Sequence, residues 1–516
     1  MYKFTNYGFG SCLKRYFSVS RELYRELPTY KVAIVGTGPA GFYTTHHLFA
    51  KANAFRLHID ILEKLPAPFG LSRYGVAPDH PEVKNCEEYL INIMKNKSDP
   101  SKNSLNHEVN FFGNIDVGKD VTLKELQENY HSIVLSYGTD NDNDLKIPGA
   151  ELEGVVPARQ FVNWYNGHPG YSSLSTDFKP PPLERVENVT IIGNGNVALD
   201  IARILLASPK SYWSPTDIHT EAFQKLQNSS VKNVNIVARR GLLESAFTNK
   251  EIRELFEISK SEGIQFLPIE ECIFKSIEPF ENLLGRADKR KLALLKKYSP
   301  QRSSERHEKS WSLKFLLSPL EIKKHDQDEE LVSATVFQVN QLTYDSLTGN
   351  TNIKPVEGET VVIKNELVIS SIGYRGILLP GFEEIGILFD SKHNRIANIG
   401  GRILSSSDEN SHGHVYKKGW YTSGWIQSGP KGVIATTMMK AFDTAENLIE
   451  DLKNEIHTNA SPDSLSNFHA KLYEKEAINW AGWLKLNEHE IAEGLKKGKS
   501  RYKESITEEM LKIANK

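Results

Sequence analysis

The sequence has few cysteines, no long apolar run and no excess of one charge. Its three cysteines, Cys12, Cys86 and Cys272, lie far apart among 516 residues, and no C-x-x-C occurs. This spacing excludes a disulfide scaffold, a zinc ribbon, cysteine ligands for an iron–sulfur cluster and a local redox dithiol in this chain. No stretch of about 18 uninterrupted apolar residues is present, which excludes a membrane-spanning helix. The 63 basic against 65 acidic side chains give a net charge of −2, which argues against a nucleic-acid-binding protein.

Acidic residues are also missing from the first 17 positions, which hold Lys3, Lys14 and Arg15 among aromatic and hydroxyl side chains. That composition is typical of a mitochondrial transit peptide. The step from Arg15 to Ser18 also looks like a matrix-processing site. We therefore expect a leader over residues 1–29 and a location in the mitochondrial matrix. The alternative is a disordered N-terminus without a targeting role.

A first dinucleotide-binding turn follows the leader. Residues 31–35 are rich in strand formers, and they precede a G-x-G-x-x-G motif and an expected helix over 42–50. In such a motif Gly36 permits the tight turn, Gly38 lets the backbone approach the pyrophosphate, and Gly41 lets helix and strand pack closely. Glu63 ends the next expected strand, where an acid binds the ribose hydroxyls. The Pro- and Gly-rich residues 66–81 then predict a rigid loop with the character of a flavin cradle.

A second turn of the same kind begins at Gly193, after an expected strand, and has Ala198 in place of the third glycine. Two such turns predict two dinucleotide domains. The next strand ends at Arg239 and Arg240, where a domain specific for NAD carries an acid. Arginines at this place would bind an adenosine 2′-phosphate, which favours NADPH over NADH. The alternative is that both are solvated side chains at a strand end.

Three further segments have recognisable patterns. Residues 329–372 alternate apolar and polar side chains between turn residues, which predicts a β-meander, and its last strand, over 366–373, is a candidate crossover back to the first domain. Residues 299–330 are polar, and we expect a surface excursion there. From about residue 463 the chain is charged and helical in pattern, which predicts helices packed on the outside.

The motifs together resemble the family of mitochondrial NADPH:adrenodoxin (ferredoxin) oxidoreductases. The similarity extends from GTGPAGFYTTHHL through PFGLSRYGVAPDHPEVKN, IIGNGNVALDIARILL and ARRGLLESAFTNKEIREL to GWIQSGPKGVIATTM and WLKLNEHE, nearly the whole folded chain. It implies an α/β fold of two Rossmann-like dinucleotide-binding domains, with the NADP domain inserted into a split FAD domain. The implied limits are 30–145 for the first FAD part, 146–372 for the NADP domain and 373–516 for the second FAD part with the C-terminal helices. The implied cofactors are FAD and NADPH.

The resemblance also assigns residues by motif. For FAD these are Gly36, Gly38, Pro39, Ala40, Gly41, Glu63, Leu71, Val117, Trp425, Gly432, Val433 and Ile434. For NADP they are Asn194, Gly195, Asn196, Val197, Arg239, Arg240, Glu251 and Gly432. Gln427 and Ser428 stand where the family pattern has a basic residue, which leaves the local charge open. The alternative for Trp425 is an aromatic side chain of the core without a role in FAD binding.

Candidate catalytic residues are Asp200 and Glu251, which would stabilise the nicotinamide or relay a proton, and His80 near the flavin. The alternatives are solvated helix charges for the two acids and a structural loop histidine for His80. The implied reaction is hydride transfer from NADPH to FAD, followed by single electrons to a [2Fe–2S] ferredoxin. That ferredoxin would serve cluster assembly, haem modification or steroid hydroxylation.

A basic stretch predicts where an acidic ferredoxin docks, because local positive charge steers an acidic partner. It contains Arg286, Lys289, Arg290, Lys291, Lys296 and Lys297. The alternative is a solvated helix face. The family implies a monomer in a transient complex, with at most peripheral membrane contact.

Three other functions would use a similar pair of nucleotide turns. A disulfide reductase needs a dithiol beside the flavin, and the electron-input subunit of a larger complex, such as the small subunit of glutamate synthase, ordinarily brings cysteine-ligated clusters. The three scattered cysteines provide neither. A non-catalytic NADP sensor would not need Trp425, Gly432 and the complete PFGL loop.

Overall fold

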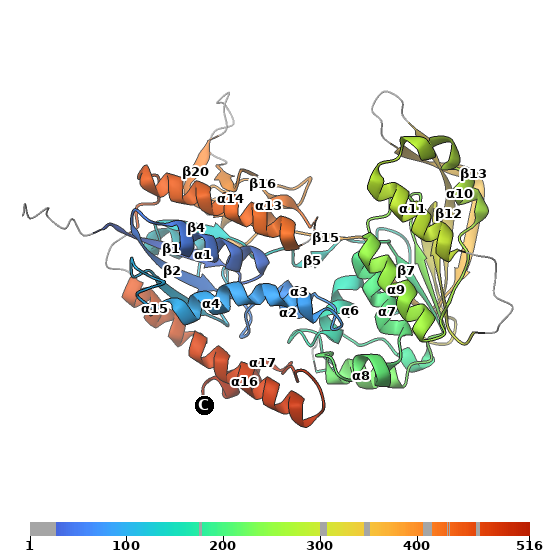
Figure 1. Ribbon diagram of the computed structural model, residues 1–516, viewed down its shortest axis with the longest axis horizontal. Coiled ribbons are helices and arrows are strands. Elements are labelled where there is room, and N and C mark those ends of the chain that lie inside the picture. Colours follow the sequence, from blue (N-terminus) through green and yellow to red (C-terminus); the bar gives the residue numbers. More distant parts are fainter. Residues whose placement is uncertain are drawn as a thin grey trace, which may run out of the picture.

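The computed structural model describes residues 27–174, 178–299, 307–344, 351–405, 415–430, 432, 434–460 and 465–516. Most of the predicted leader, and Val433, lie outside the described residues. The described chain forms two lobes that lie side by side (Figure 1). Within the described ranges no helix combines the length and apolar composition that a membrane crossing requires.

The first lobe is built on a sheet from both ends of the chain, with the order β18-β19-β20-β4-β1-β2-β3. Its strands are β1 (Thr29–Val35), β2 (Arg56–Leu62), β3 (Glu108–Phe112), β4 (Ser132–Leu135), β18 (Asn398–Ile399), β19 (Arg402–Leu404) and β20 (Tyr416–Thr422). β20 pairs in parallel with β4, so a late segment completes a sheet begun at the N-terminus. The core strands are apolar and buried because helices cover both faces.

The helices of this lobe place the site loops at the carboxyl ends of the strands. They are α1 (Pro39–Lys51), α2 (Leu71–Tyr74), α3 (Pro81–Lys84), α4 (Glu88–Asn96), α5 (Leu123–Asn129), α12 (Phe382–Ile385), α13 (Trp425–Ser428) and α14 (Ile434–Lys453). α1 and α14 lie against each other in Figure 1, although almost four hundred residues separate them in sequence. A small pair, β16 (Phe389–Asp390) and β17 (Arg395–Ile396), lies in the same lobe.

The second lobe contains a sheet with the order β6-β14-β7-β8-β10-β9. Its strands are β6 (Val155–Pro157), β7 (Asn188–Ile192), β8 (Asn233–Val237), β9 (Gln265–Phe266), β10 (Ser310–Lys314) and β14 (Leu367–Ser370). Its helices are α6 (Ala158–Tyr165), α7 (Asn196–Leu206), α8 (Thr220–Gln227), α9 (Asn249–Ser261), α10 (Glu271–Lys275) and α11 (Arg286–Tyr298).

The expectation of a surface excursion over residues 299–330 is wrong for the described part of this range, and residues 300–306 lie outside the described residues. β10 lies inside the second sheet between β8 and β9, and its Trp311 is completely buried. The polar sequence around Trp311 does not indicate a buried strand. Its serines are nevertheless satisfied inside the sheet, because the hydroxyls of Ser310 and Ser312 donate to Asn233 and Asn235 on the adjacent strand.

The predicted meander is confirmed in part, because its first strand lies before the expected range of 329–372. β11 (Leu317–Lys324), β12 (Val332–Tyr344) and β13 (Thr351–Lys364) form an antiparallel sheet in chain order. The strand expected to end the meander, β14, instead pairs in parallel with β6 and β7 in the second sheet, and the crossover back to the first lobe follows it. There β15 (Tyr374–Arg375) pairs antiparallel with β5 (Asn141–Asp142), so the outgoing and returning chains run side by side between the lobes (Figure 1).

The order of the strands confirms the predicted fold class, in which one dinucleotide-type domain is inserted into another that is split. The residue limits of the domains stay a prediction.

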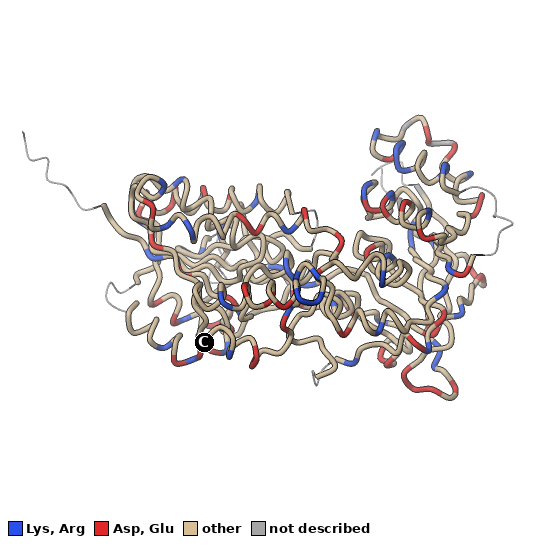
Figure 2. Tube along the Cα trace, turned by 60° about the horizontal axis from the view of Figure 1, so that its bottom comes forward, with Lys and Arg blue, Asp and Glu red and all other residues tan. Residues whose placement is uncertain are grey.

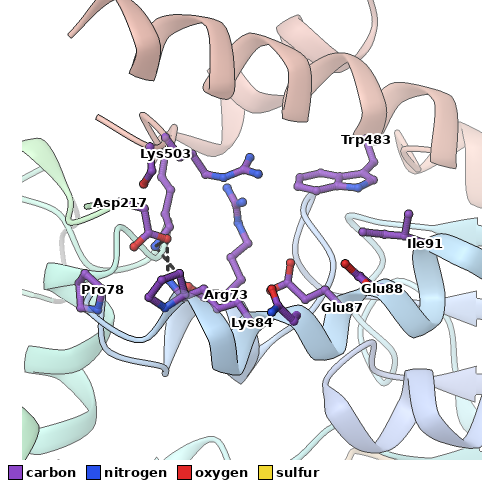
Figure 3. A pocket seen from close by; sticks show the side chains of 13 residues that line it. Arg73, Pro78, Lys84, Glu87, Glu88, Ile91, Asp217, Trp483 and Lys503 are labelled. Carbon is purple, nitrogen blue, oxygen red and sulfur yellow. Dashed lines mark hydrogen bonds and ion pairs between the residues drawn. The ribbon is translucent and has the colours of Figure 1, made fainter. Parts of the chain in front are cut away.

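The C-terminal helices α15 (Leu465–Glu474), α16 (Trp480–Lys496) and α17 (Thr507–Ala514) lie along the outside, as expected. Glu490 of α16 is buried and pairs with Arg73 of α2 at 2.6 Å, which fixes α16 to the first lobe. The chain beyond α16 links the lobes: Lys503 lies 3.0 Å from Asp217 of the second lobe, and Lys84 lies 2.6 Å from the same carboxylate. Arg73, Lys84, Asp217 and Lys503 line a pocket of about 290 Å³ (Figure 3).

Candidate functional site

The first glycine turn has the geometry of a dinucleotide cradle. Gly36 has φ +97°, and a Cβ there would lie 2.8 Å from the Ser136 carbonyl oxygen. A Cβ at Gly41 would lie 2.0 Å from the oxygen of Gly36, so the close packing of strand and helix requires glycine. A Cβ at Gly38 would meet no atom within 4 Å. Gly38 therefore faces open space at the N-terminus of α1, where Pro39 and Ala40 begin the helix and backbone N–H groups favour an anion.

Glu63 lies beside this turn at the end of β2. Its carboxylate accepts hydrogen bonds from the Thr37 N–H at 2.9 Å, the Thr37 hydroxyl and the Leu65 N–H at 3.0 Å. Burial raises the pKa of Glu63, and these hydrogen bonds act in the opposite direction. The bonds hold the carboxylate in one orientation, as a ribose-binding acid requires.

The Pro- and Gly-rich loop packs directly on the first turn. The Phe69 N–H donates to the Thr37 hydroxyl at 3.1 Å, and a Cβ at Gly70 would lie 3.1 Å from the Gly38 Cα. Leu71 begins α2 at that point. Val117 is buried in the loop after β3, two residues beyond Ile115, whose N–H donates to the carbonyl of Glu63.

The late segment of the first lobe reaches the same place. A Cβ at Gly424 would lie 2.5 Å from the Cβ of Ala40, so the start of α13 touches the start of α1. The ring of Trp425, the next residue, stacks with that of Tyr374 at 5.9 Å between centroids. Gly432 has φ +94° and Ile434 begins α14, while Val433 lies outside the described residues. Gln427, in place of a basic residue, is buried and its amide donates to Thr444.

The second turn repeats the geometry of the first. A Cβ at Gly193 would lie 2.0 Å from the Ser371 carbonyl oxygen, whereas a Cβ at Gly195 would meet no atom within 4 Å. The Asn194 amide donates to Ser245, and the Asn196 side chain accepts the Thr248 N–H.

Two flanking features complete this second site. Val197 follows Asn196 in the first turn of α7. Arg239 and Arg240 are exposed just beyond the end of β8, beside the turn, where their charges are available to a phosphate.

The three candidate catalytic residues meet where the lobes touch. Arg203 of α7, which the sequence analysis missed, is their common neighbour and is completely buried. Its guanidinium lies 2.9 Å from Asp200, 3.3 Å from Glu251 and 2.6 Å from His80 Nε2. It also pairs with Asp79 of the first lobe at 2.9 Å. Asp79 and Arg203 both lie inside the quoted motifs, but their pairing is visible only in three dimensions.

Burial and like charge perturb this cluster. The pKa of Asp200 is raised to about 6, mainly by burial; Glu251 and Asp79 act in the same direction, and Arg203 acts against them. Burial also raises the pKa of Glu254, whose carboxylate lies 3.4 Å from His80 Nε2. A carboxyl group with a raised pKa that lies between two nucleotide turns is suited to proton exchange.

The predicted docking surface lies on α11, and one of its residues differs from the rest. Arg286, Lys289 and Arg290 are exposed. Lys291 is buried instead: its ammonium donates to the Ser245 carbonyl oxygen at 2.8 Å and lies over the Phe247 ring. Lys291 therefore anchors α11 and does not offer its charge to a partner. Figure 2 shows basic and acidic residues interspersed over both lobes, so any docking charge is local.

Comparisons with known proteins agree with this geometry. Residues 30–273 match the family of pyridine nucleotide-disulphide oxidoreductases. The chain is 38% identical to a probable mitochondrial NADPH:adrenodoxin oxidoreductase of Saccharomyces cerevisiae, over 95% of this chain and 97% of that one. It is 36% identical to the mitochondrial NADPH:adrenodoxin oxidoreductase of Homo sapiens, over 94% and 92%. The solved structure of Mycobacterium tuberculosis FprA in complex with NADPH matches with a TM-score of 0.80 and 34% identity, over 95% of this chain and 100% of that chain.

Proposed function

The chain belongs to the NADPH:adrenodoxin oxidoreductase family, and on that premise we propose how its residues serve the reaction. The enzyme takes a hydride from NADPH onto FAD and passes single electrons to a [2Fe–2S] ferredoxin of the adrenodoxin type. The observation that carries the assignment is the meeting of both nucleotide sites at one buried cluster, through Asp79 and His80 from one lobe and Arg203 and Glu251 from the other.

The first lobe fits FAD. Gly38 leaves space beside the N-terminus of α1 for a pyrophosphate, and Glu63 is oriented by Thr37 and Leu65 to accept ribose hydroxyls. The PFGL loop before Leu71 and Gly424 at the start of α13 lie against this turn from opposite ends of the chain. When bound, FAD supplies the chemistry that links two-electron and one-electron transfer.

The second lobe fits NADPH. Gly195 leaves the matching space for its pyrophosphate, and Asn194 and Asn196 are held by the loop that starts α9. Arg239 and Arg240 provide the positive charge that a 2′-phosphate needs. The disulfide-reductase alternative is not supported, because the described cysteines, Cys86 and Cys272, are both free thiols.

The cluster around Arg203 positions the groups between the two sites. His80 Nε2 accepts from Arg203 and its Nδ1 lies 3.3 Å from Glu82, so the imidazole is held from both sides. Glu251 and Glu254 lie 3.6 Å and 3.4 Å from its Nε2. Asp200, whose pKa is raised to about 6, pairs with the same guanidinium and can hold a proton there. The guanidinium keeps these carboxylates together in a buried place where water has little access.

For the partner, Arg286, Lys289 and Arg290 on α11 form the docking surface for an acidic ferredoxin. The enzyme acts as a monomer in the mitochondrial matrix and meets its partner transiently. The relatives' names support a mitochondrial location and an adrenodoxin-type partner.

Steady-state reduction of a purified acidic [2Fe–2S] ferredoxin tests the proposal. We expect turnover with NADPH, little with NADH, and a steep loss of rate as salt rises, because exposed charges are screened at about 10 Å in 0.1 M salt. Triple replacement of Arg286, Lys289 and Arg290 by Gln should raise KM for ferredoxin and leave NADPH oxidation by a small artificial acceptor unchanged. Equal rates with both nucleotides, or a salt-independent rate, would contradict it.

A further inference from the structure

A second cluster of titratable groups lies away from the nucleotide sites, on the face of the first sheet that α15 covers. His58 and Asp60 are two positions apart on β2 and so point to the same face. His469 reaches them from α15. His58 Nε2 lies 3.1 Å from Asp60 Oδ1, and His469 Nε2 lies 2.6 Å from Asp60 Oδ2. The three donor atoms all lie within 4.8 Å of one another.

Asn110 lies beside this cluster. Its amide donates to Asp60 Oδ1 at 2.9 Å, and the amide nitrogen lies 3.2 Å from His58 Nε2. A neutral imidazole that carries its proton on the other ring nitrogen presents a lone pair at Nε2, and this lone pair is the one that a metal ion would use.

The surroundings are those of a prepared ligand set. The other nitrogen of His58, Nδ1, lies 2.9 Å from Glu108, the outer carboxylate that fixes a metal-binding imidazole. Asp60 is completely buried, and its second oxygen accepts from the Tyr130 hydroxyl at 2.8 Å. His469 packs against the Phe112 ring, which limits its rotation. The two histidine side chains are 17% and 22% exposed, so an ion can enter from solvent.

We propose that His58, Asp60 and His469 bind a divalent transition-metal ion of the Zn²⁺ class, which fastens α15 to the sheet. Two imidazole nitrogens and one carboxylate oxygen suit Zn²⁺ and leave its fourth position to water. The other group of this kind among the described residues, His80 with Glu251 and Glu254, is not such a site. There the Arg203 guanidinium lies 2.6 Å from the imidazole nitrogen that a metal would need.

Zinc titration of the tag-free, chelator-treated holoenzyme tests the proposal, with free Zn²⁺ set by a chromophoric competitor. We expect one site per chain in the wild type and binding weakened more than about tenfold in His469→Gln and in His58→Gln, since loss of even an outer partner has that effect. The matched control is His393→Gln, because His393 pairs with a single carboxylate, Asp390, at 2.7 Å. It should bind zinc as the wild type does.

A second measurement does not depend on the folding of any variant. Zinc K-edge absorption of the wild-type complex should show two imidazole ligands and no sulfur. Absence of stoichiometric binding, equal binding by His469→Gln, or a spectrum with fewer than two imidazoles would overturn the proposal and leave a hydrogen-bonded network alone. Flavin reduction by NADPH should be the same with and without zinc, so this result is separate from the proposed function.

Discussion

Replacement of Arg203 by Met should destabilise the contact between the lobes more than any surface change. Arg203 is completely buried and within 3.3 Å of Asp79, Asp200 and Glu251. Breaking a buried ion pair by removal of one partner costs about 3–5 kcal/mol, because the charges left behind stay desolvated. For a domain of 150–250 residues this is a fall in Tm of roughly 6–20 °C.

The penalty should also depend on pH. The pKa of Asp200 is raised to about 6, chiefly by burial, although Arg203 acts in the opposite direction. Without Arg203 the pKa of Asp200 rises further, so the folded variant takes up a proton at this carboxyl as the pH falls. The difference in unfolding free energy between variant and wild type then becomes smaller. The deficit in stability should therefore be larger at pH 8 than at pH 6.

Thermal and urea unfolding of the holoenzyme at both pH values would measure this. Lys250→Ala is the control, because Lys250 is 58% exposed and pairs with Glu82 at 3.2 Å and Glu254 at 3.5 Å. An exposed pair contributes about 0–1 kcal/mol. A loss of stability for Arg203→Met no larger than that of the control, or one that grows as the pH falls, would show that Arg203 does not hold a buried ion-pair network between the lobes.

Three other predictions follow from the same structure. Arg240→Gln should raise KM for NADPH about tenfold or more and leave NADH kinetics unchanged, because a charge-assisted hydrogen bond contributes about 1.5–3 kcal/mol; equal losses with both nucleotides would count against the 2′-phosphate role. Gly38→Val should give a folded but colourless protein, since its side chain fills only the open cradle, whereas retained flavin absorbance would contradict the cradle. The enzyme should lose stability as the pH falls from 6.5 towards 4. Burial lowers the pKa of His131 and of His219 to about 4, so in this pH range the unfolded chain binds more protons than the folded chain. His219→Gln should make Tm less dependent on pH, and an unchanged slope would show that His219 does not cause this dependence.

The local parts of the site could be predicted from the sequence, because they depend on short spacings. Gly36, Gly38 and Gly41 follow a strand and open a helix, and each has the steric role that its place in the motif requires. Glu63 ends the next strand beside them. The motif fixes these relations within about thirty residues, so no tertiary information is needed.

The parts that depend on distant contacts could not be predicted in the same way. Arg203 looks like an ordinary helix charge in sequence, and only the meeting of the lobes buries it against Asp79. Lys291 sits in a basic run whose other members are exposed, yet helix periodicity turns its side chain towards Ser245. Trp311 lies in a polar stretch that looks exposed in sequence, but the serines on both sides of it donate hydrogen bonds to asparagines of the neighbouring strand.

The electron path from NADPH through FAD to a ferredoxin is tested by anaerobic mixing of the holoenzyme first with NADPH or NADH and then with an oxidised acidic [2Fe–2S] ferredoxin. We expect rapid loss of the oxidised flavin band with NADPH, a poor response to NADH, and then bleaching of the ferredoxin. A flavin that is reduced while the ferredoxin stays oxidised would contradict the proposed partner. A protein that shows no flavin band even after FAD is added would contradict the oxidoreductase assignment itself.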